Sequence, residues 1–369
     1  MKEQRFLIPL VGVIALVAVG FVLKVAQAVI LPLIIAWLLS YLLAPIVNFL
    51  VCRRIPLAVA IFCVVLLLIG FCYLIGFFVY GRVMSFVGQY DVYAAKLLQI
   101  STDFMTRLHI PPEYIKEFHW TGEIGRWLVS KSGSFVGFMG DMTKVLIFLI
   151  FMLTGKPYAK VKIEAALGEK SQKISEVTEC IAGEISRYLS IKLFISTITA
   201  LLALALLTIM DIDFAVTWAV LTFLLNFIPT IGSIVATIPP VLIALVQFYP
   251  SFWPAVILLI GLIVIQQVMG NILDPKLTGD RLNLSPVVIL LSLLFWGWLW
   301  GITGALLSVP ITSAIKIACE NIELLKPVSV MMGSGKIAHR KKQEEEREKE
   351  QAAHEPARYS LVSRHQAAD

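Results

Sequence analysis

Long apolar stretches with very few charges constrain this chain more than any other feature. From Leu282 to Ile315 the sequence has no charged side chain, and from Leu193 to Leu273 the charges are Asp211 and Asp213. A helix that crosses a bilayer needs about 20 apolar residues, whereas a water-soluble fold could not cover stretches of this length. The runs are continuous rather than alternating, which argues against a β-barrel. The sequence therefore predicts an all-α, polytopic membrane protein.

Composition and motifs exclude several other classes. Apolar residues make up 58% of the chain and charged residues 15%, against about 45–50% and about 25% in soluble domains. The net charge of +6 is not gathered into a basic block with interleaved aromatic residues, so nucleic acid is not an expected partner. The sequence has no HExxH, no GxSxG and no CxxC pair. We therefore expect no enzyme, no cofactor and no metal site, and a lipid bilayer as the surroundings.

Run lengths and basic residues predict about eight spans. Lys2 and Arg5 should hold an uncleaved first span, Phe6–Leu23, with its N-terminus in the cytosol. The basic turn at Arg53 and Arg54 should also be cytosolic. The predicted regions are three spans (1–80), an extracytoplasmic helical block (81–141), a fourth span (142–155), a cytosolic amphipathic helix (156–192), a transport core with broken helices (193–320) and a charged cytosolic tail (321–369).

A helix-breaking segment lies inside the apolar run that follows Asp213. Asn226-Phe227-Ile228-Pro229-Thr230-Ile231-Gly232 combines a proline and a glycine with two polar side chains. Such a break frees backbone groups, which must then be satisfied by protein or by a water-filled cavity. Transporters place solute and ion sites at breaks of this kind. We expect Asn226, Pro229, Thr230 and Gly232 to form a site in a broken or re-entrant hairpin. The alternative is a tight hairpin in which Asn226 caps a helix.

A second polar cluster follows the next apolar run. Gln267, Asn271 and Asp274 recur at roughly one-turn spacing, and acidic residues at a membrane edge often mark ion pathways. We expect these three side chains to form a polar path to the cytosol. The alternative is that Asp274-Pro275 terminates a helix and that Asp274 pairs with Lys276 in a cytosolic loop.

The third motif is Phe295-Trp296-Gly297-Trp298-Leu299-Trp300-Gly301. Gly297 and Gly301 form a GxxxG pattern, which is typical of close packing between membrane helices. We expect the two glycines to act in helix packing. The tryptophans either belong to an interfacial belt or line an apolar cavity.

At these motifs the sequence resembles the autoinducer-2 exporter family of bacterial inner-membrane proteins. Four stretches carry the resemblance, namely Asn226–Gly232, Asn271–Lys276, Leu290–Gly301 and Leu306–Pro310. It is strongest from about residue 156 to 320, and the first three spans match only in pattern. Where the family often has Glu before the proline of the second motif, this chain has Asp274, which keeps the charge with a shorter reach.

The resemblance implies an exporter of the quorum-sensing signal autoinducer-2, or a sodium/proton antiporter, and a homo-oligomer such as a pentamer. Our leading interpretation is export or facilitated passage of a small polar solute. The second is a monovalent cation/proton antiporter in which Asp274 titrates. The third is a non-transporting membrane scaffold, which would need no polar groups inside the membrane. The inner membrane, with both termini in the cytosol, is the expected location.

Overall fold

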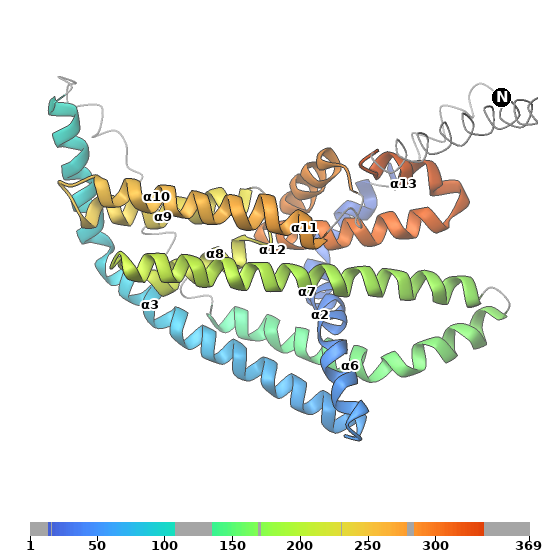
Figure 1. The fold of residues 1–369 in the computed structure, drawn as a ribbon. Helices are drawn as coiled ribbons and strands as arrows, with labels where there is room; N and C mark the ends of the chain where they lie inside the picture. Colours follow the sequence, from blue (N-terminus) through green and yellow to red (C-terminus); the bar gives the residue numbers. More distant parts are fainter. Residues whose placement is uncertain are drawn as a thin grey trace, which may run out of the picture.

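The computed structural model describes residues 14–15, 17–107, 135–168, 171–229, 231–278 and 284–335. The described residues are almost entirely helical (Figure 1). Residue Thr230 and the tail from residue 336 onward lie outside them, as do parts of the predicted first span and of the 81–141 block. The named elements are α2 (Gln27–Cys52), α3 (Leu57–Arg107), α6 (Phe135–Leu167), α7 (Ser171–Ile209), α8 (Ala215–Leu225), α9 (Ile231–Gln247), α10 (Trp253–Gln266), the π-helix η2 (Gln267–Leu273), α11 (Asp274–Thr278), α12 (Pro286–Asn321), η3 (Glu323–Leu325) and α13 (Lys326–Met332).

The predicted class, a polytopic helical membrane protein, is confirmed. In the described part of the chain, four helices are long and apolar enough to cross a membrane, namely Gln27–Cys52, Ile174–Ile209, Trp253–Leu277 and Pro286–Asn321. Three shorter apolar helices accompany them, Leu57–Tyr73, Ala215–Leu225 and Ile231–Gln247.

Helix α7 packs against more of the other helices than any other described element does. It contacts α2, α6, α8, α10, η2, α11 and α12 and runs across most of the view in Figure 1. Its 39 residues give a rod about 58 Å long, against about 30 Å for a hydrocarbon core. The predicted division between an amphipathic helix ending at Lys192 and a span beginning at Leu193 therefore falls inside one continuous helix.

Helix α3 is also longer than one membrane thickness. Its 51 residues join the predicted third span to the first part of the 81–141 block without interruption. The far part of α3 reaches the end of the molecule where α7 meets α8. There Tyr93 Oη donates to Asp213 Oδ2 at 2.5 Å, and Asp103 Oδ2 accepts from Tyr249 Oη at 2.5 Å. Burial, with the Asp213 carboxylate, raises the pKa of Tyr93, so this phenol stays protonated and remains a donor.

Several apolar cores hold the described helices together, and two of them are the largest. One lies among α7, α8, α9 and α10 and includes Leu207, Trp218 and Leu258. The other lies among α2, α3 and α6 and includes Ala60 and Leu149. Burial of the apolar area in the first core stabilises the packing of α7 against α8, α9 and α10.

Helices α8 and α9 form a re-entrant hairpin. Gln247, at the end of α9, accepts from the backbone N–H of Asp213 at 3.0 Å and donates to the carbonyl of Asp211 at 2.6 Å. The start of α8 and the end of α9 therefore meet beside the end of α7. Helix α8 has 11 residues, fewer than a bilayer crossing needs, and α9 has 17, which is at the lower end of the range for a crossing. The predicted break between them is confirmed, since α8 ends at Leu225 and α9 begins at Ile231.

Helix α12 is a second hairpin. Its backbone leaves the helical region at Trp300 and Gly301, where Gly301 has φ 65° and ψ −145°, a conformation that is essentially restricted to glycine. The two arms then run back along each other, because Ser292 Oγ donates to the carbonyl of Ser308 at 3.0 Å and also contacts Thr312.

The structure assigns the glycines of α12 to roles that differ from the expected ones. Gly301 lies at the turn, and a Cβ there would meet no atom within 4 Å. A Cβ at Gly297 would make an ordinary contact with Ala305. The close approach belongs to Gly304, where a Cβ would overlap the carbonyl oxygen of Trp296. Within the described chain, the arms of this hairpin therefore pack closely through Gly304 rather than through the GxxxG pair.

Candidate functional site

The tip of the α8–α9 hairpin is built by three of the predicted residues. Asn226 is 8% exposed and its Nδ2 donates to Ser196 Oγ of α7 at 3.0 Å. The carbonyl of Pro229 accepts from the N–H of Ile231 at 2.6 Å, which starts α9. At Gly232 a Cβ would overlap the carbonyl oxygen of Leu225, so only glycine lets the two arms approach at this point. The fourth predicted residue, Thr230, lies outside the described residues.

The tip lies at membrane depth. Its partner Ser196 is separated from Ile209, the end of α7, by a stretch of helix about 20 Å long. Because the hairpin enters from that end of α7, its tip lies inside a hydrocarbon core about 30 Å thick. The amide of Asn226 is satisfied there by a hydroxyl rather than by water, as burial requires.

Asp274 lies close to this tip. It forms an ion pair that the sequence did not predict. Lys192 Nζ donates to Asp274 Oδ2 at 2.7 Å, and the two side chains are 8% and 22% exposed. The alternative expectation, that Asp274 pairs with Lys276, is replaced by a partner 82 residues away in the sequence. Asp274 is also the first residue of α11, directly after the π-helix η2.

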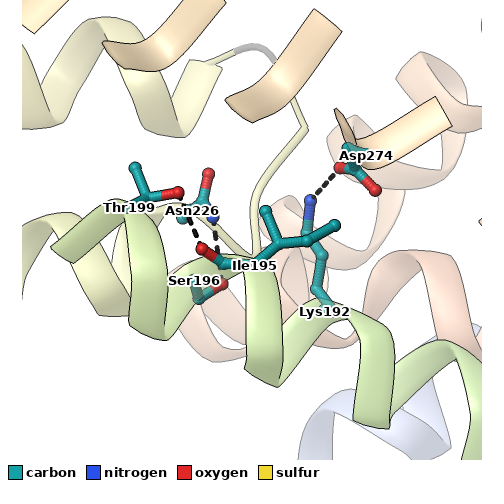
Figure 2. A network of polar contacts seen from close by, with 6 residues as sticks. All are labelled: Lys192, Ile195, Ser196, Thr199, Asn226 and Asp274. Carbon is teal, nitrogen blue, oxygen red and sulfur yellow. Dashed lines mark hydrogen bonds and ion pairs between the residues drawn. The ribbon is translucent and has the colours of Figure 1, made fainter. Parts of the chain in front are cut away.

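One face of α7 joins the two predicted motifs (Figure 2). Lys192 and Ser196 are one helical turn apart, about 6 Å along the axis. Thr199 continues the same face, with its Oγ1 donating to the carbonyl of Ile195 at 2.7 Å. The face therefore carries the amide contact of the hairpin tip and the ion pair side by side. We call these five residues (Lys192, Ser196, Thr199, Asn226 and Asp274) the α7 polar cluster.

A signal for the α7 residues was present in the sequence. Lys192, Ser196 and Thr199 recur at spacings of four and three residues at the start of an apolar run, which is the period of one helix face. Lys192 was assigned to the end of a cytosolic helix because charged residues usually mark the edge of a span. Because α7 continues without a break through this position, Lys192 lies among the packed helices, where it is buried.

Burial gives the ion pair a large influence on stability. Removing two charges from water is costly, and only good geometry with further hydrogen bonds offsets that cost. Removing one partner leaves an uncompensated buried charge, which costs about 3–5 kcal/mol in proteins. The pair thus fastens the η2–α11 segment to α7 as long as both partners are charged.

The remaining predicted residues, Gln267 and Asn271, lie apart from the α7 polar cluster. Both side chains are exposed, and Asn271 Nδ2 donates to Gln267 Oε1 within the π-helix η2. Gln267 instead lines a cavity of about 430 Å³ between α9 and α10, together with Ser233 and Thr237. This cavity begins one residue after Gly232, so it reaches the hairpin tip from the α10 side. π-Helical turns of this kind are frequent at functional sites.

Metal ligation has no geometric support in this region. Across the parts of the chain that the structure describes, no three His, Cys, Asp or Glu side chains come together. The chemistry that the α7 polar cluster offers is hydrogen bonding by amide and hydroxyl groups, next to one ion pair. These groups suit a polar solute with several hydroxyls or a small cation that competes with Lys192 for Asp274.

A family model for AI-2E family transporters matches residues 11–324. The chain belongs to the AI-2E transporter family. The match includes both hairpins and every residue of the α7 polar cluster. It also extends to the first spans, where the sequence resembled the family only in pattern.

Curated relatives of the family are transport proteins by name. A putative transport protein of Borreliella burgdorferi is 36% identical over 250 residues, which cover 68% of this chain and 69% of that protein. A putative transport protein of Haemophilus influenzae is 33% identical over 327 residues, which cover 85% and 92%. The AI-2 transport protein TqsA of Escherichia coli is 40% identical over 194 residues, which cover 53% and 56%. The chain is thus a multi-pass bacterial membrane protein of a transporter family.

Proposed function

We propose that this transporter exports a small polar solute, with autoinducer-2 as the first candidate, through a site at the tip of the α8–α9 hairpin. The observation that carries the proposal is the position of Asn226, buried against Ser196 and one helical turn from the Lys192–Asp274 pair. The choice of autoinducer-2 rests on the resemblance and on the name of the Escherichia coli relative.

The proposed site binds by exchange of hydrogen bonds. A solute with several hydroxyl groups replaces the Asn226–Ser196 contact with contacts of its own, and backbone groups at the break supply further donors and acceptors. Neutral groups suffice, because a neutral solute brings no charge into the membrane. The path toward η2 is closed by the Lys192–Asp274 pair, so this pair opens when solute passes.

A second candidate, cation/proton antiport, is favoured by the ion pair itself. A carboxylate that can exchange its lysine partner for sodium or a proton is a means of ion coupling. Asp274→Asn separates the two candidates, because asparagine keeps much of the hydrogen bonding but does not titrate. Ion-coupled flux should be abolished by this change, whereas flux of a neutral solute should survive with a reduced rate.

The test is flux in proteoliposomes that contain the full chain. Autoinducer-2 flux and sodium flux are each measured with and without a pH gradient, for the wild type and for Asn226→Ala and Ser196→Ala. We expect each variant to lower solute flux at least about fivefold, the effect of one lost buried hydrogen bond. Ser190→Ala is the matched control, because Ser190 is an exposed serine on the same helix. Wild-type flux in the well-inserted Asn226→Ala protein would contradict the proposed site.

A further inference from the structure

A crevice separate from the α7 polar cluster lies among α2, α6 and the first half of α7. Its volume is about 400 Å³, and its walls are largely apolar. Residues from all three helices line it, including Trp37, Tyr41, Met152, Lys156, Ser175 and Glu179. No residue of the proposed solute site takes part in this lining.

One polar group in the crevice has no hydrogen-bond partner among the described residues. Ser175 is 8% exposed, and its Oγ is fully buried without a hydrogen bond to the described chain. Buried hydroxyls are nearly always paired, so an unpaired one in the wall of a cavity indicates a ligand or a water. The crevice is large enough for either.

Lys156 brings a cation to the same crevice. Its ammonium lies 4.8 Å from the centre of the Tyr41 ring, and Trp37 Nε1 donates to Tyr41 Oη at 3.1 Å. Burial lowers the pKa of Lys156, because its charge has lost part of its water. An anion beside the ammonium would compensate for that loss. Glu179 also lines the crevice.

Two helices independently place this end of the crevice at the membrane surface. In α6, Lys156 directly follows the predicted fourth span, 142–155. In α7, Ser186 donates to the carbonyl of Tyr41 at 3.0 Å, and the stretch from Ser186 to Ile209 is about 35 Å. Both observations put Tyr41 and Lys156 at headgroup level. Phe151 of α6 is 72% exposed, so an apolar face suited to acyl chains continues from this point into the membrane.

We propose that the crevice binds an anionic phospholipid, with its phosphate between the Lys156 ammonium and the Ser175 hydroxyl. The acyl chains lie along the exposed apolar face of α6, and Trp37 and Tyr41 form the aromatic wall at headgroup level, where these residue types are favoured. The inference goes beyond the proposed function, because it concerns neither the transported solute nor the hairpin tip.

The test measures lipid retention by the full chain purified in detergent. The protein is exchanged into equal amounts of phosphatidylglycerol and phosphatidylcholine, and bound lipid is counted by native mass spectrometry. We expect wild-type protein to retain phosphatidylglycerol about tenfold better than phosphatidylcholine. Lys156→Gln should lower this preference about fivefold, the effect of one basic group at a lipid surface. Ser175→Ala should lower it about two- to threefold.

Matched controls separate a lipid from a soluble anion as the occupant of the crevice. Lys162→Gln removes an exposed charge from the same helix outside the crevice and should leave the preference unchanged. Glu179→Gln should preserve or strengthen it. An unchanged preference in Lys156→Gln would overturn the proposal. Displacement of the lipid by millimolar sn-glycerol 3-phosphate would also overturn it, in favour of a soluble phosphate ester as the occupant.

Discussion

The α8–α9 hairpin and the α12 hairpin reverse the chain in the same way inside apolar sequence. Each depends on a glycine where a Cβ would overlap a carbonyl oxygen of the preceding arm, at Gly232 for Leu225 and at Gly304 for Trp296. In each hairpin the two arms pack against each other, and each hairpin packs against α7. The backbone solution is therefore shared, and a difference in role must come from the side chains at the two tips.

Those side chains differ in kind. The first tip presents the amide of Asn226 to the hydroxyl of Ser196. The second presents Trp296 and Trp300, whose rings lie 4.9 Å apart, and Trp300 Nε1 donates to the carbonyl of Leu23 at 3.2 Å. An indole on an apolar surface with one satisfied N–H is an anchor, whereas an amide and a hydroxyl next to an ion pair can exchange partners with a solute. The comparison assigns binding to the first hairpin and anchoring to the second.

The largest effect is expected at the ion pair beside the polar tip. Lys192→Met removes the ammonium that neutralises the partly buried Asp274 carboxylate, so the free energy of unfolding should fall by about 3–5 kcal/mol. Thermal unfolding in detergent measures this loss. The double variant Lys192→Met/Asp274→Leu should recover most of the stability, since replacing a whole buried pair with apolar groups is often neutral. Wild-type stability in the single variant would show that the pair is not buried in the membrane.

The close approach between hairpin arms can be disrupted by the same substitution in both hairpins. Gly232→Ala and Gly304→Ala each force a methyl group against a carbonyl oxygen, and we expect losses of about 1–3 kcal/mol for each. Gly270→Ala is the control, because a Cβ there would meet nothing within 4 Å. Melting temperatures of the three proteins give the comparison. A loss at only one of the two sites would show that the hairpins do not share their packing.

The side-chain difference should separate transport from stability. Asn226→Ala should lower solute flux at least about fivefold, as argued above for one buried hydrogen bond. Trp300→Phe removes the hydrogen bond to Leu23 while keeping an aromatic ring, so it should cost about 1 kcal/mol of stability and leave flux intact. Flux in proteoliposomes and melting in detergent are measured on both proteins. Loss of flux in Trp300→Phe with normal insertion would give the second hairpin a part in transport.

The sequence was sufficient for the features that depend on local chemistry. A proline and a glycine inside an apolar run predicted the break at 226–232, and the structure has it between Leu225 and Ile231. The charge-free runs predicted the membrane class. These signals work because backbone breaks and transfer to hydrocarbon depend on a few neighbouring residues.

Features that depend on register between distant helices could not be predicted. Lys192 and Asp274 are 82 residues apart, and their meeting depends on how α11 packs against α7. The glycine pattern at 297 and 301 gave no sign that the chain turns back at 301, because the same pattern fits a straight helix as well as a turn. Because the chain turns at Gly301, the residue of the returning arm that approaches the Trp296 carbonyl most closely is Gly304.

The smallest effect on stability, and the sharpest test of the geometry, concerns the faces from which the two hairpins enter. The base of the α8–α9 hairpin lies at Asp211 and Gln247, beside the end of α7. The base of α12 packs with Leu284 and Val309 against Tyr188 of α7. The stretch from Tyr188 to Ile209 is about 30 Å long, one hydrocarbon thickness. The hairpins should therefore enter from opposite faces, with the α12 base on the cytosolic side.

Single cysteines at Ser251 and Leu324, both exposed, report the two bases in a protein whose five native cysteines are replaced by alanine. An impermeant maleimide added to intact spheroplasts should label Ser251→Cys, and added to inside-out vesicles it should label Leu324→Cys. The free energies of unfolding, measured by thermal unfolding, should stay within about 0.5 kcal/mol of the parent's, as for other exposed positions. Labelling of both cysteines from one face would place both hairpin bases on that face. That result would contradict the length estimate along α7 that places the two bases on opposite faces.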